Sequence, residues 1–416
     1  MSHRVTTVSI VCALGLLGGP VSSAQRADRG LAAGAFTEIA TPAASGAAEP
    51  NLAVDRRGRP WLSWLEPRPA GGHAFRASAW SGTTFGPPIT IAEGTNFLAN
   101  WADFPAMFFA QDGTIAAHWL ERAGSRAAYG IRMKTSTDGV RWSAPLTPHR
   151  DASPVEHGFV SFFDAPGGGV GVVWLDGREM APNGPGGHGS GNMTLRATTV
   201  KGGALGEEML LDPRVCDCCQ TAAARTADGI VVAYRDRSTP EPGQTEIRDI
   251  AVVRFEGGSW SKPTTVREDR WELTGCPVNG PAIAASGRRV VVAWFTDAGR
   301  EPRVQAAFSE DAGRTFGTPA RLDTAVTLGR MSVAMAAADR AFVSFIERTE
   351  TGGRLVVREV RPGGVVGDPV TVAAVSRDRA SGFPQLAMAG GRLFVAWTDI
   401  QPNTPPRVRV AAARVD

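Results

Sequence analysis

Four cysteines stand where their thiols could act together. Cys216, Cys218 and Cys219 form a C-x-C-C motif, and Cys276 follows in the segment Gly275–Pro281. Four thiolates at close spacing suit a soft metal, copper or zinc. Two disulfides are the alternative, and a complete pairing then needs one bond inside the motif, across a vicinal or one-residue gap that strains disulfide geometry. A strained disulfide is easily reduced, so the cluster could also be a redox device.

Acids and arginines form a second, repeated set of candidate residues. An aromatic-x-acid motif recurs along the chain and supplies Glu66, Glu121, Asp176, Asp236, Asp297, Glu347 and Asp399, most of them followed closely by arginine. Repetition favours a structural girdle of ion pairs over catalysis, because a catalytic site needs one asymmetric environment. The predicted ligand-binding residues are Asp236 and Arg237 of this set, together with three arginines outside it, Arg330, Arg377 and Arg379.

The elements that must position these residues belong to a sequence repeat. A small-apolar strand, a turn and a strand ending in an aromatic residue and an acid recur at Asn51–Glu66, Pro105–Glu121, Phe159–Asp176, Thr221–Asp236, Pro281–Asp297, Ser332–Glu347 and Pro384–Asp399. A second pattern, a strand with arginine followed by a glycine turn and a proline, falls between the copies. Each unit therefore supplies four strands, and a period of roughly 50 to 60 residues is typical of propellers.

The two ends of the repeat predict how the ring closes. The last unit has a third strand at Arg407–Val415 and then ends, whereas Phe36–Ala40 has the pattern of a missing fourth strand. Pairing these two segments would remove an exposed sheet edge. The sequence thus predicts an all-β protein, a seven-bladed β-propeller of four-stranded antiparallel blades closed by an N-terminal strand, with six blades as the alternative. Equivalent loops entering neighbouring units then bring the four cysteines to one face, near the central channel.

One turn carries a resemblance to a known family. Ser309–Phe316 resembles the Asp box, S-x-D-x-G-x-T-[WF], of the sialidase-like BNR propellers, and Ser136–Trp142 looks like a version one residue shorter. The resemblance extends over the whole mature chain as a repeat. It implies that the box is a structural turn between the third and fourth strands of a blade, away from the ligand. True sialidases of this family have six blades, so seven would be a departure.

The same resemblance allows a test for sialidase chemistry, which needs an arginine triad, a tyrosine nucleophile paired with glutamate, and an aspartic acid. The mature chain has two tyrosines, Tyr129 and Tyr234, and none later. Tyr234 occupies the packing position that other units fill with tryptophan or phenylalanine. The family's early F/Y-R-I-P motif is absent. We therefore expect a relative that is not a true sialidase, and keep a glycoside hydrolase acting on anionic sugars and a non-catalytic interaction scaffold as alternatives.

The N-terminus and the composition limit where the protein works and on what. Residues 1–24 have the pattern of a signal peptide cleaved near Ala24, residues 25–35 of a short linker, and residues 36–416 of a single propeller domain. The apolar run Val8–Gly19 is too short to span a bilayer. A secreted or periplasmic protein is predicted. A net charge of +3 without a basic block argues against a nucleic-acid partner, which leaves a small molecule, a glycan, a metal or a protein.

Overall fold

The computed structural model describes residues 1, 3, 31–32, 34–123, 128–180, 191–239 and 243–415. Apart from Met1 and His3, the predicted signal peptide lies outside the described residues, as do residues 25–30 and 33 of the predicted linker. Among the residues that are described, no helix combines the length and the apolar character needed to cross a membrane.

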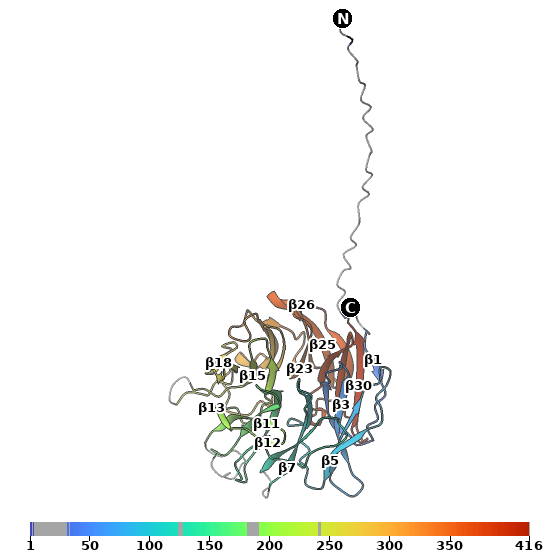
Figure 1. Ribbon diagram of the computed structural model, residues 1–416, viewed down its shortest axis with the longest axis vertical. Coiled ribbons are helices and arrows are strands. Elements are labelled where there is room, and N and C mark those ends of the chain that lie inside the picture. Colours follow the sequence, from blue (N-terminus) through green and yellow to red (C-terminus); the bar gives the residue numbers. More distant parts are fainter. Residues whose placement is uncertain are drawn as a thin grey trace.

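Seven antiparallel sheets in the described part of the chain are arranged as blades of a propeller (Figure 1). The first four blades are β2 (Ala48–Val54), β3 (Pro60–Pro67), β4 (His73–Ala79) and β5 (Ile89–Gly94); β6 (Ala106–Phe109), β7 (Ile115–Arg122) and β8 (Tyr129–Ser136); β9 (His157–Asp164), β10 (Val170–Asp176), β11 (Met193–Lys201), β12 (Ala204–Leu205) and β13 (Met209–Val215); and β14 (Ala222–Arg225), β15 (Ile230–Arg235), β16 (Ile250–Glu256), β17 (Ser259–Trp260) and β18 (Thr264–Thr265). In the second blade, Leu146 bridges to Met133 where a fourth strand would lie.

The last three blades complete the ring. They are β19 (Ala282–Ser286), β20 (Arg289–Thr296), β21 (Arg303–Ser309) and β22 (Ala320–Arg321); β23 (Thr327–Ala337), β24 (Arg340–Arg348), β25 (Gly353–Arg361), β26 (Val365–Val366) and β27 (Val370–Val375); and β28 (Gln385–Ala389), β29 (Arg392–Asp399), β30 (Arg407–Arg414) and β1 (Thr37–Ile39). Three short 3-10 turns, η1 (Ala298–Arg300), η2 (Pro362–Gly364) and η3 (Arg379–Ser381), lie in the connections.

The ring closes through the N-terminal strand, as the sequence predicts. Strand β1 pairs antiparallel with β30, with Thr37 opposite Ala412 and Ile39 opposite Val410 (Figure 1). The Arg409 guanidinium bonds to Glu38 across this pair. The seven-bladed prediction is confirmed, and the six-bladed alternative is wrong.

Adjacent blades are held together by the apolar side chains of their central strands. Strand β10 is buried at every position, and β15 likewise, because both faces of a blade's middle strand pack on neighbouring blades. One apolar cluster, for example, joins Val231 and Val252 of the fourth blade to Trp294 of the fifth. This packing makes the blades a rigid frame from which loops project at both ends of the channel.

The aromatic-x-acid motif is a structural unit in the first three blades. Its two residues share a face of the strand because side chains two apart point the same way. The Trp64 indole donates to Glu66 at 3.0 Å, and the same bond joins Trp119 to Glu121 at 2.9 Å and Trp174 to Asp176 at 2.7 Å.

The arginines that pair with these acids are mostly not the ones that follow them in sequence. In four blades the partner stands on the third strand, as in the pairs Arg76–Glu66, Arg132–Glu121, Arg354–Glu347 and Arg409–Asp399. Arg178, which bonds to Asp176 at 2.7 Å, is the exception in the described residues. The girdle is therefore built across strands, where Arg76 faces Trp64 and Arg132 faces Trp119.

The turn with the Asp-box pattern connects β21 to β22. Asp311 accepts hydrogen bonds from the Thr315 N–H at 2.9 Å and the Thr315 hydroxyl at 2.6 Å, and Ser309 accepts from the Gly313 N–H at 2.8 Å. These bonds close the turn, which is the structural role expected of it. It lies at the far end of the third strand from the loops described next.

Candidate functional site

The girdle of acids and cross-strand arginines is interrupted in the fourth and fifth blades. The interruption lies at the end of the channel where the innermost strands begin. We call this end the entrance face. Tyr234 faces Ala251 and Trp294 faces Gln305, so neither has the cross-strand arginine of the girdle. The Trp294 indole donates to Asp269 instead, at 2.7 Å. Local asymmetry of this kind marks a candidate site, and the cysteines lie in the loops that enter these two blades.

The cysteines do not form a set of four thiolates in this structure. Cys218 and Cys276 form a disulfide, whose Cα atoms are 6.1 Å apart, and both are half-buried. Cys216 and Cys219 are free and buried, with their sulfurs 3.5 Å apart. The assumption that every complete pairing needs a vicinal or one-residue bond is wrong: pairing Cys218 with Cys276 leaves a C-x-x-C pair, whose two-residue gap is longer.

The two free thiols have different environments. Hydrogen bonding to Cys219 and burial raise the pKa of Cys216. Burial also opposes ionisation of Cys219, but hydrogen bonding from Cys216, the charge of Arg235 and the Asn279 N–H lower its pKa to about 7. The hydrogen bond between the two sulfurs therefore favours the proton on Cys216 and the negative charge on Cys219.

Arg235 is the cation whose charge helps to lower the pKa of Cys219. It is 2% exposed, and its guanidinium donates to the carbonyls of Asn279 at 2.8 Å and Phe295 at 2.7 Å while lying 4.9 Å over the Trp271 ring. No ion pair joins it to a carboxylate in the described residues. Because a buried charge is costly without a counter-charge, the Cys219 sulfur is its natural anionic neighbour.

Three further arginines gather beside the disulfide. Arg214, Arg237 and Arg248, here called the arginine cluster, bond to the single carboxylate of Glu246 at 2.6, 2.8 and 2.9 Å. Burial acts to raise the pKa of Glu246, but hydrogen bonds from Arg237 and Arg214 hold it below its usual value. The Arg248 side chain is 5% exposed, and its Nε and Nη1 atoms make no hydrogen bond to the described residues.

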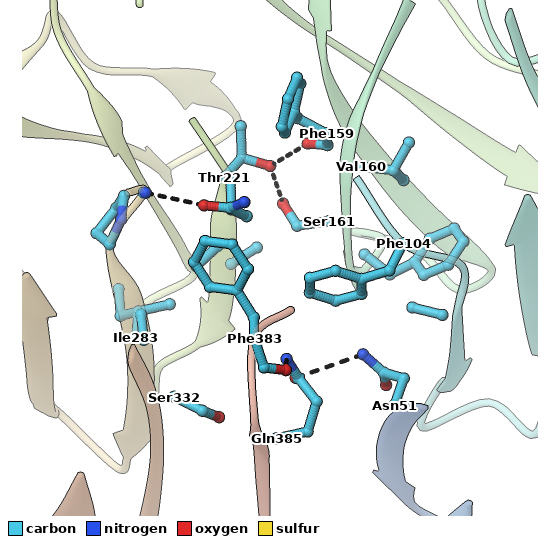
Figure 2. A pocket seen from close by; sticks show the side chains of 18 of the residues that line it. Asn51, Phe104, Phe159, Val160, Ser161, Thr221, Ile283, Ser332, Phe383 and Gln385 are labelled. Atoms are coloured by element: carbon cyan, nitrogen blue, oxygen red, sulfur yellow. Dashed lines mark hydrogen bonds between the residues drawn. The ribbon is translucent and has the colours of Figure 1, made fainter. Parts of the chain in front are cut away.

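The cysteine loop also reaches the channel. Gln220, next to Cys219, donates to the Ala102 carbonyl at 2.6 Å and accepts from the Gly280 N–H at 2.9 Å. Below it lies a cavity of about 310 Å³ lined by the innermost strands. Figure 2 shows the Phe104 and Phe383 rings in this cavity.

Polar side chains also line the same cavity. Asn51 bonds to Gln385 at 3.5 Å, and Thr221 bonds to Ser161 at 2.8 Å (Figure 2). These residues bond to one another within the channel wall. The cavity is thus a polar and aromatic chamber, and Asp103 of its lining is itself buried.

Two acids near this chamber hold their protons unusually tightly. Burial, and then the charge of Asp103, raise the pKa of Glu49 to about 8. Burial raises the pKa of Asp103 to about 7, against the opposing effects of the Phe159 N–H and the Tyr129 hydroxyl. Glu49 lies in β2 of the first blade and Asp103 in the loop entering the second blade, so no sequence motif joins them.

The other predicted ligand-binding residues lie elsewhere on the entrance face. Arg330 is 7% exposed and donates to the Asp378 carbonyl at 3.0 Å and the Ser381 hydroxyl at 2.7 Å, so it fixes the loop that carries Arg377 and Arg379. Arg379 is exposed and lies 5.9 Å from the Trp101 ring. These three arginines are separate from the arginine cluster, to which only Arg237 of the predicted set belongs.

Asp236 and Tyr234 are positioned by packing. Burial and the charge of Asp212 raise the pKa of Asp236 to about 6. Tyr234 is 1% exposed, and its hydroxyl donates to Asp212 at 2.6 Å. The ring therefore lies in the core, which agrees with the packing role expected from its place in the repeat.

A second group of potential metal ligands is already occupied. Oxygen and nitrogen atoms of Asp151, His157 and Asp176 lie within 4.8 Å of one another. However, Arg178 bonds to both carboxylate oxygens of Asp176, at 2.8 and 2.7 Å, and Trp174 donates to it as well. A cation would have to displace the guanidinium, so these residues form an ion-pair network.

Comparisons with known proteins agree with the fold. No protein-family model and no curated protein sequence matches the chain. Among solved structures, the BP39L lectin from Burkholderia pseudomallei has a TM-score of 0.61 at 14% identity over 89% of this chain and 97% of the lectin. A PL25 ulvan lyase bound to -[GlcA(1-4)Rha3S]- has a TM-score of 0.55 at 12% identity over 89% and 95%. A Dyadobacter fermentans protein described as of unknown function scores 0.54 at 14% identity over 93% and 99%. At these identities the likeness shows the fold.

Proposed function

We propose that the protein is an exported, secreted or periplasmic, propeller that binds an acidic saccharide at its arginine cluster. The observation that carries the proposal is the convergence of Arg214, Arg237 and Arg248 on one carboxylate, Glu246. Arg248 also lies 3.9 Å from Asp217, so three guanidinium groups face two carboxylates and leave one positive charge over. Guanidinium suits a carboxylate or sulfate because its donors bind two oxygens at once.

Two further observations support an acidic sugar. The Nε atom of Arg248 is buried without a hydrogen bond to the described residues, and such a donor normally has a partner; its Nη1 atom lies 3.9 Å from Asp217. The neighbours in fold include a lectin and a lyase bound to a saccharide with a GlcA unit. The predicted residue Arg237 belongs to this site.

The test is calorimetric binding of a glucuronic-acid-containing oligosaccharide and of a neutral oligosaccharide of the same length. We expect the acidic ligand alone to bind, with affinity falling as salt rises. Arg237→Gln removes one charge-assisted contact and should weaken binding by about tenfold or more. Arg225→Gln, an exposed arginine at the other end of the same blade, is the matched control and should bind normally. Equal binding of both ligands, or unchanged binding by Arg237→Gln, would exclude the arginine cluster.

Soft-metal binding remains a second proposal, limited to the reduced protein. Ligand atoms of Cys216, Asp217, Cys218 and Cys276 lie within 4.8 Å of one another, but two of these sulfurs are joined in the disulfide. Thiolates, not disulfides, hold copper or zinc. We expect metal analysis to find copper or zinc only after reduction, and less of it in Cys276→Ser. Metal retained by the oxidised protein, or none bound by the reduced protein, would contradict the proposal.

A further inference from the structure

We propose that the four cysteines form an internal thiol–disulfide relay, in which one disulfide moves between a surface pair, Cys218–Cys276, and a buried pair, Cys216–Cys219. The relay would let the buried dithiol reduce the surface disulfide, and the surface pair would then exchange with an external thiol or disulfide. This activity is independent of saccharide binding.

The arrangement of the sulfurs supports each transfer. The Cys216 sulfur lies within 4.8 Å of the sulfurs of both Cys218 and Cys276, and 3.5 Å from that of Cys219. Cys216 is therefore the central sulfur, with the disulfide on one side and the second free thiol on the other. Exchange requires only that a thiolate reach a disulfide sulfur, so small movements of these loops suffice.

Contact between the two buried sulfurs lets either of them become the thiolate. The Cys216 thiol donates a hydrogen bond to the Cys219 sulfur at 3.5 Å. The shared proton can pass from Cys216 to Cys219 along this hydrogen bond. Cys216 then becomes the nucleophile without any base from solvent, which matters because it is 1% exposed.

The exchange balances without an added oxidant. The Cys216 thiolate attacks the Cys276 sulfur, the Cys216–Cys276 bond forms, and the Cys218–Cys276 bond breaks to release the Cys218 thiolate. The proton on Cys219 passes to Cys218. The Cys219 thiolate then attacks Cys216, forming the Cys216–Cys219 disulfide and releasing the Cys276 thiolate. Two electrons have moved from the buried pair to the surface pair, and one proton and one negative charge are present before and after.

Burial gives the two pairs different roles. Cys216 and Cys219 are 1% and 2% exposed, whereas Cys218 and Cys276 are half-buried. An external thiol can reach only the surface pair in the closed structure, because access controls which disulfide reacts. The buried pair then serves as the reservoir of reducing equivalents.

The experiment prepares protein with one disulfide per chain and maps it by peptide mass spectrometry after acid quench and alkylation. Cys219→Ser removes the thiol that completes the transfer, so the exchange should stop at the intermediate. We expect a Cys216–Cys276 disulfide in this variant, and both Cys218–Cys276 and Cys216–Cys219 in the native sequence. Cys216→Ser is the matched control and should hold only Cys218–Cys276. Finding only Cys218–Cys276 in both Cys219→Ser and the native sequence would overturn the relay.

A second measurement uses the native sequence and therefore does not depend on whether a variant folds. Native one-disulfide protein is exposed to iodoacetamide over time, and the labelled positions are identified. A relay predicts label on Cys218 and Cys276, the pair that the structure shows as a disulfide. A fixed disulfide beside inert thiols predicts no label on Cys218 or Cys276, and that result would reject the proposal whatever the outcome of the saccharide experiment.

Discussion

Acidic side chains of the entrance face are held in two ways at the scale of single residues. Glu66 and Glu121 each have an indole N–H and a cross-strand arginine as partners. Glu49 and Asp103 are instead buried beside each other, and their pKa values are raised to about 8 and about 7. The first kind is repeated and structural, whereas the second occurs where β2 meets the loop entering the second blade.

The raised pKa values predict how stability depends on pH. A carboxyl whose pKa is higher in the folded state binds more protons there, so its stabilising effect is complete below the unfolded pKa and is lost as pH rises through the folded value. The free energy of unfolding should therefore fall as pH rises from about 4 to about 8, because Glu49 and Asp103 lose their protons over this range.

Glu49→Gln and Asp103→Asn mimic the protonated forms and should flatten that slope. The measurement is the free energy of unfolding in urea across this pH range. Glu310→Gln, at a side chain 69% exposed, is the control and should keep the slope of the native sequence. If both buried variants kept that slope as well, the two acids would not be the protonated groups.

Sequence patterns predicted the first kind of acid and missed the second. The aromatic-x-acid motif recurs, and its two residues share a strand face, so their contact is local. Glu49, in β2, and Asp103, in the loop before β6, are single acids 54 positions apart in the sequence, and only the ring brings them together. Arg235, buried without an ion pair to the described acids, likewise has no signal in the sequence.

The loops that enter the fourth and fifth blades form the candidate site at the scale of elements. They touch directly: a Cβ placed on Gly280 would lie 2.1 Å from the backbone oxygen of Gln220. Val278, a β-branched residue between Cys276 and Gly280, has a φ of 48°, which is strained for such a side chain. Close packing therefore fixes one cysteine loop against the other.

Gly280→Ala should separate these loops. The added methyl group meets backbone that cannot rotate away, so we expect a loss of about 1–3 kcal/mol in the free energy of unfolding. Gly275→Ala is the matched control in the same loop, because a Cβ there meets no atom within 4 Å. Urea denaturation distinguishes them, and equal midpoints for the two variants would show that the contact is not tight.

The cysteine pairing shows why loop chemistry was harder to predict than the blades. Strand positions follow from apolar alternation, which is a local signal. Any of the three cysteines in the C-x-C-C motif could reach Cys276, depending on how the two loops lie on the ring. The spacing within the motif does not determine which one does. The sequence placed all four on one face, which is correct, but left their bonds open.

At the scale of the whole molecule, the main structural feature is the closure of the ring of blades by an N-terminal strand. Seven blades pack around the channel, and the last of them takes its outer strand, β1, from the N-terminal part of the chain. The prediction of Phe36–Ala40 as the closing strand matches β1, Thr37–Ile39, within one residue at each end. It succeeded because an unpaired edge is costly and one segment alone had the right pattern.

Removing that strand should therefore weaken the entire ring. A chain starting at Thr41 loses the pairing of β1 with β30 and the bond between Arg409 and Glu38. Three cross-strand pairs and one exposed ion pair are together worth on the order of 3 kcal/mol, and the bare edge of β30 should promote aggregation that grows with protein concentration. A chain starting at Gly34 keeps β1 and is the matched control. Thermal unfolding and light scattering compare the two. If both chains melted at the same temperature and stayed monodisperse, β1 would be an accessory strand, and the other blades alone would hold the propeller closed.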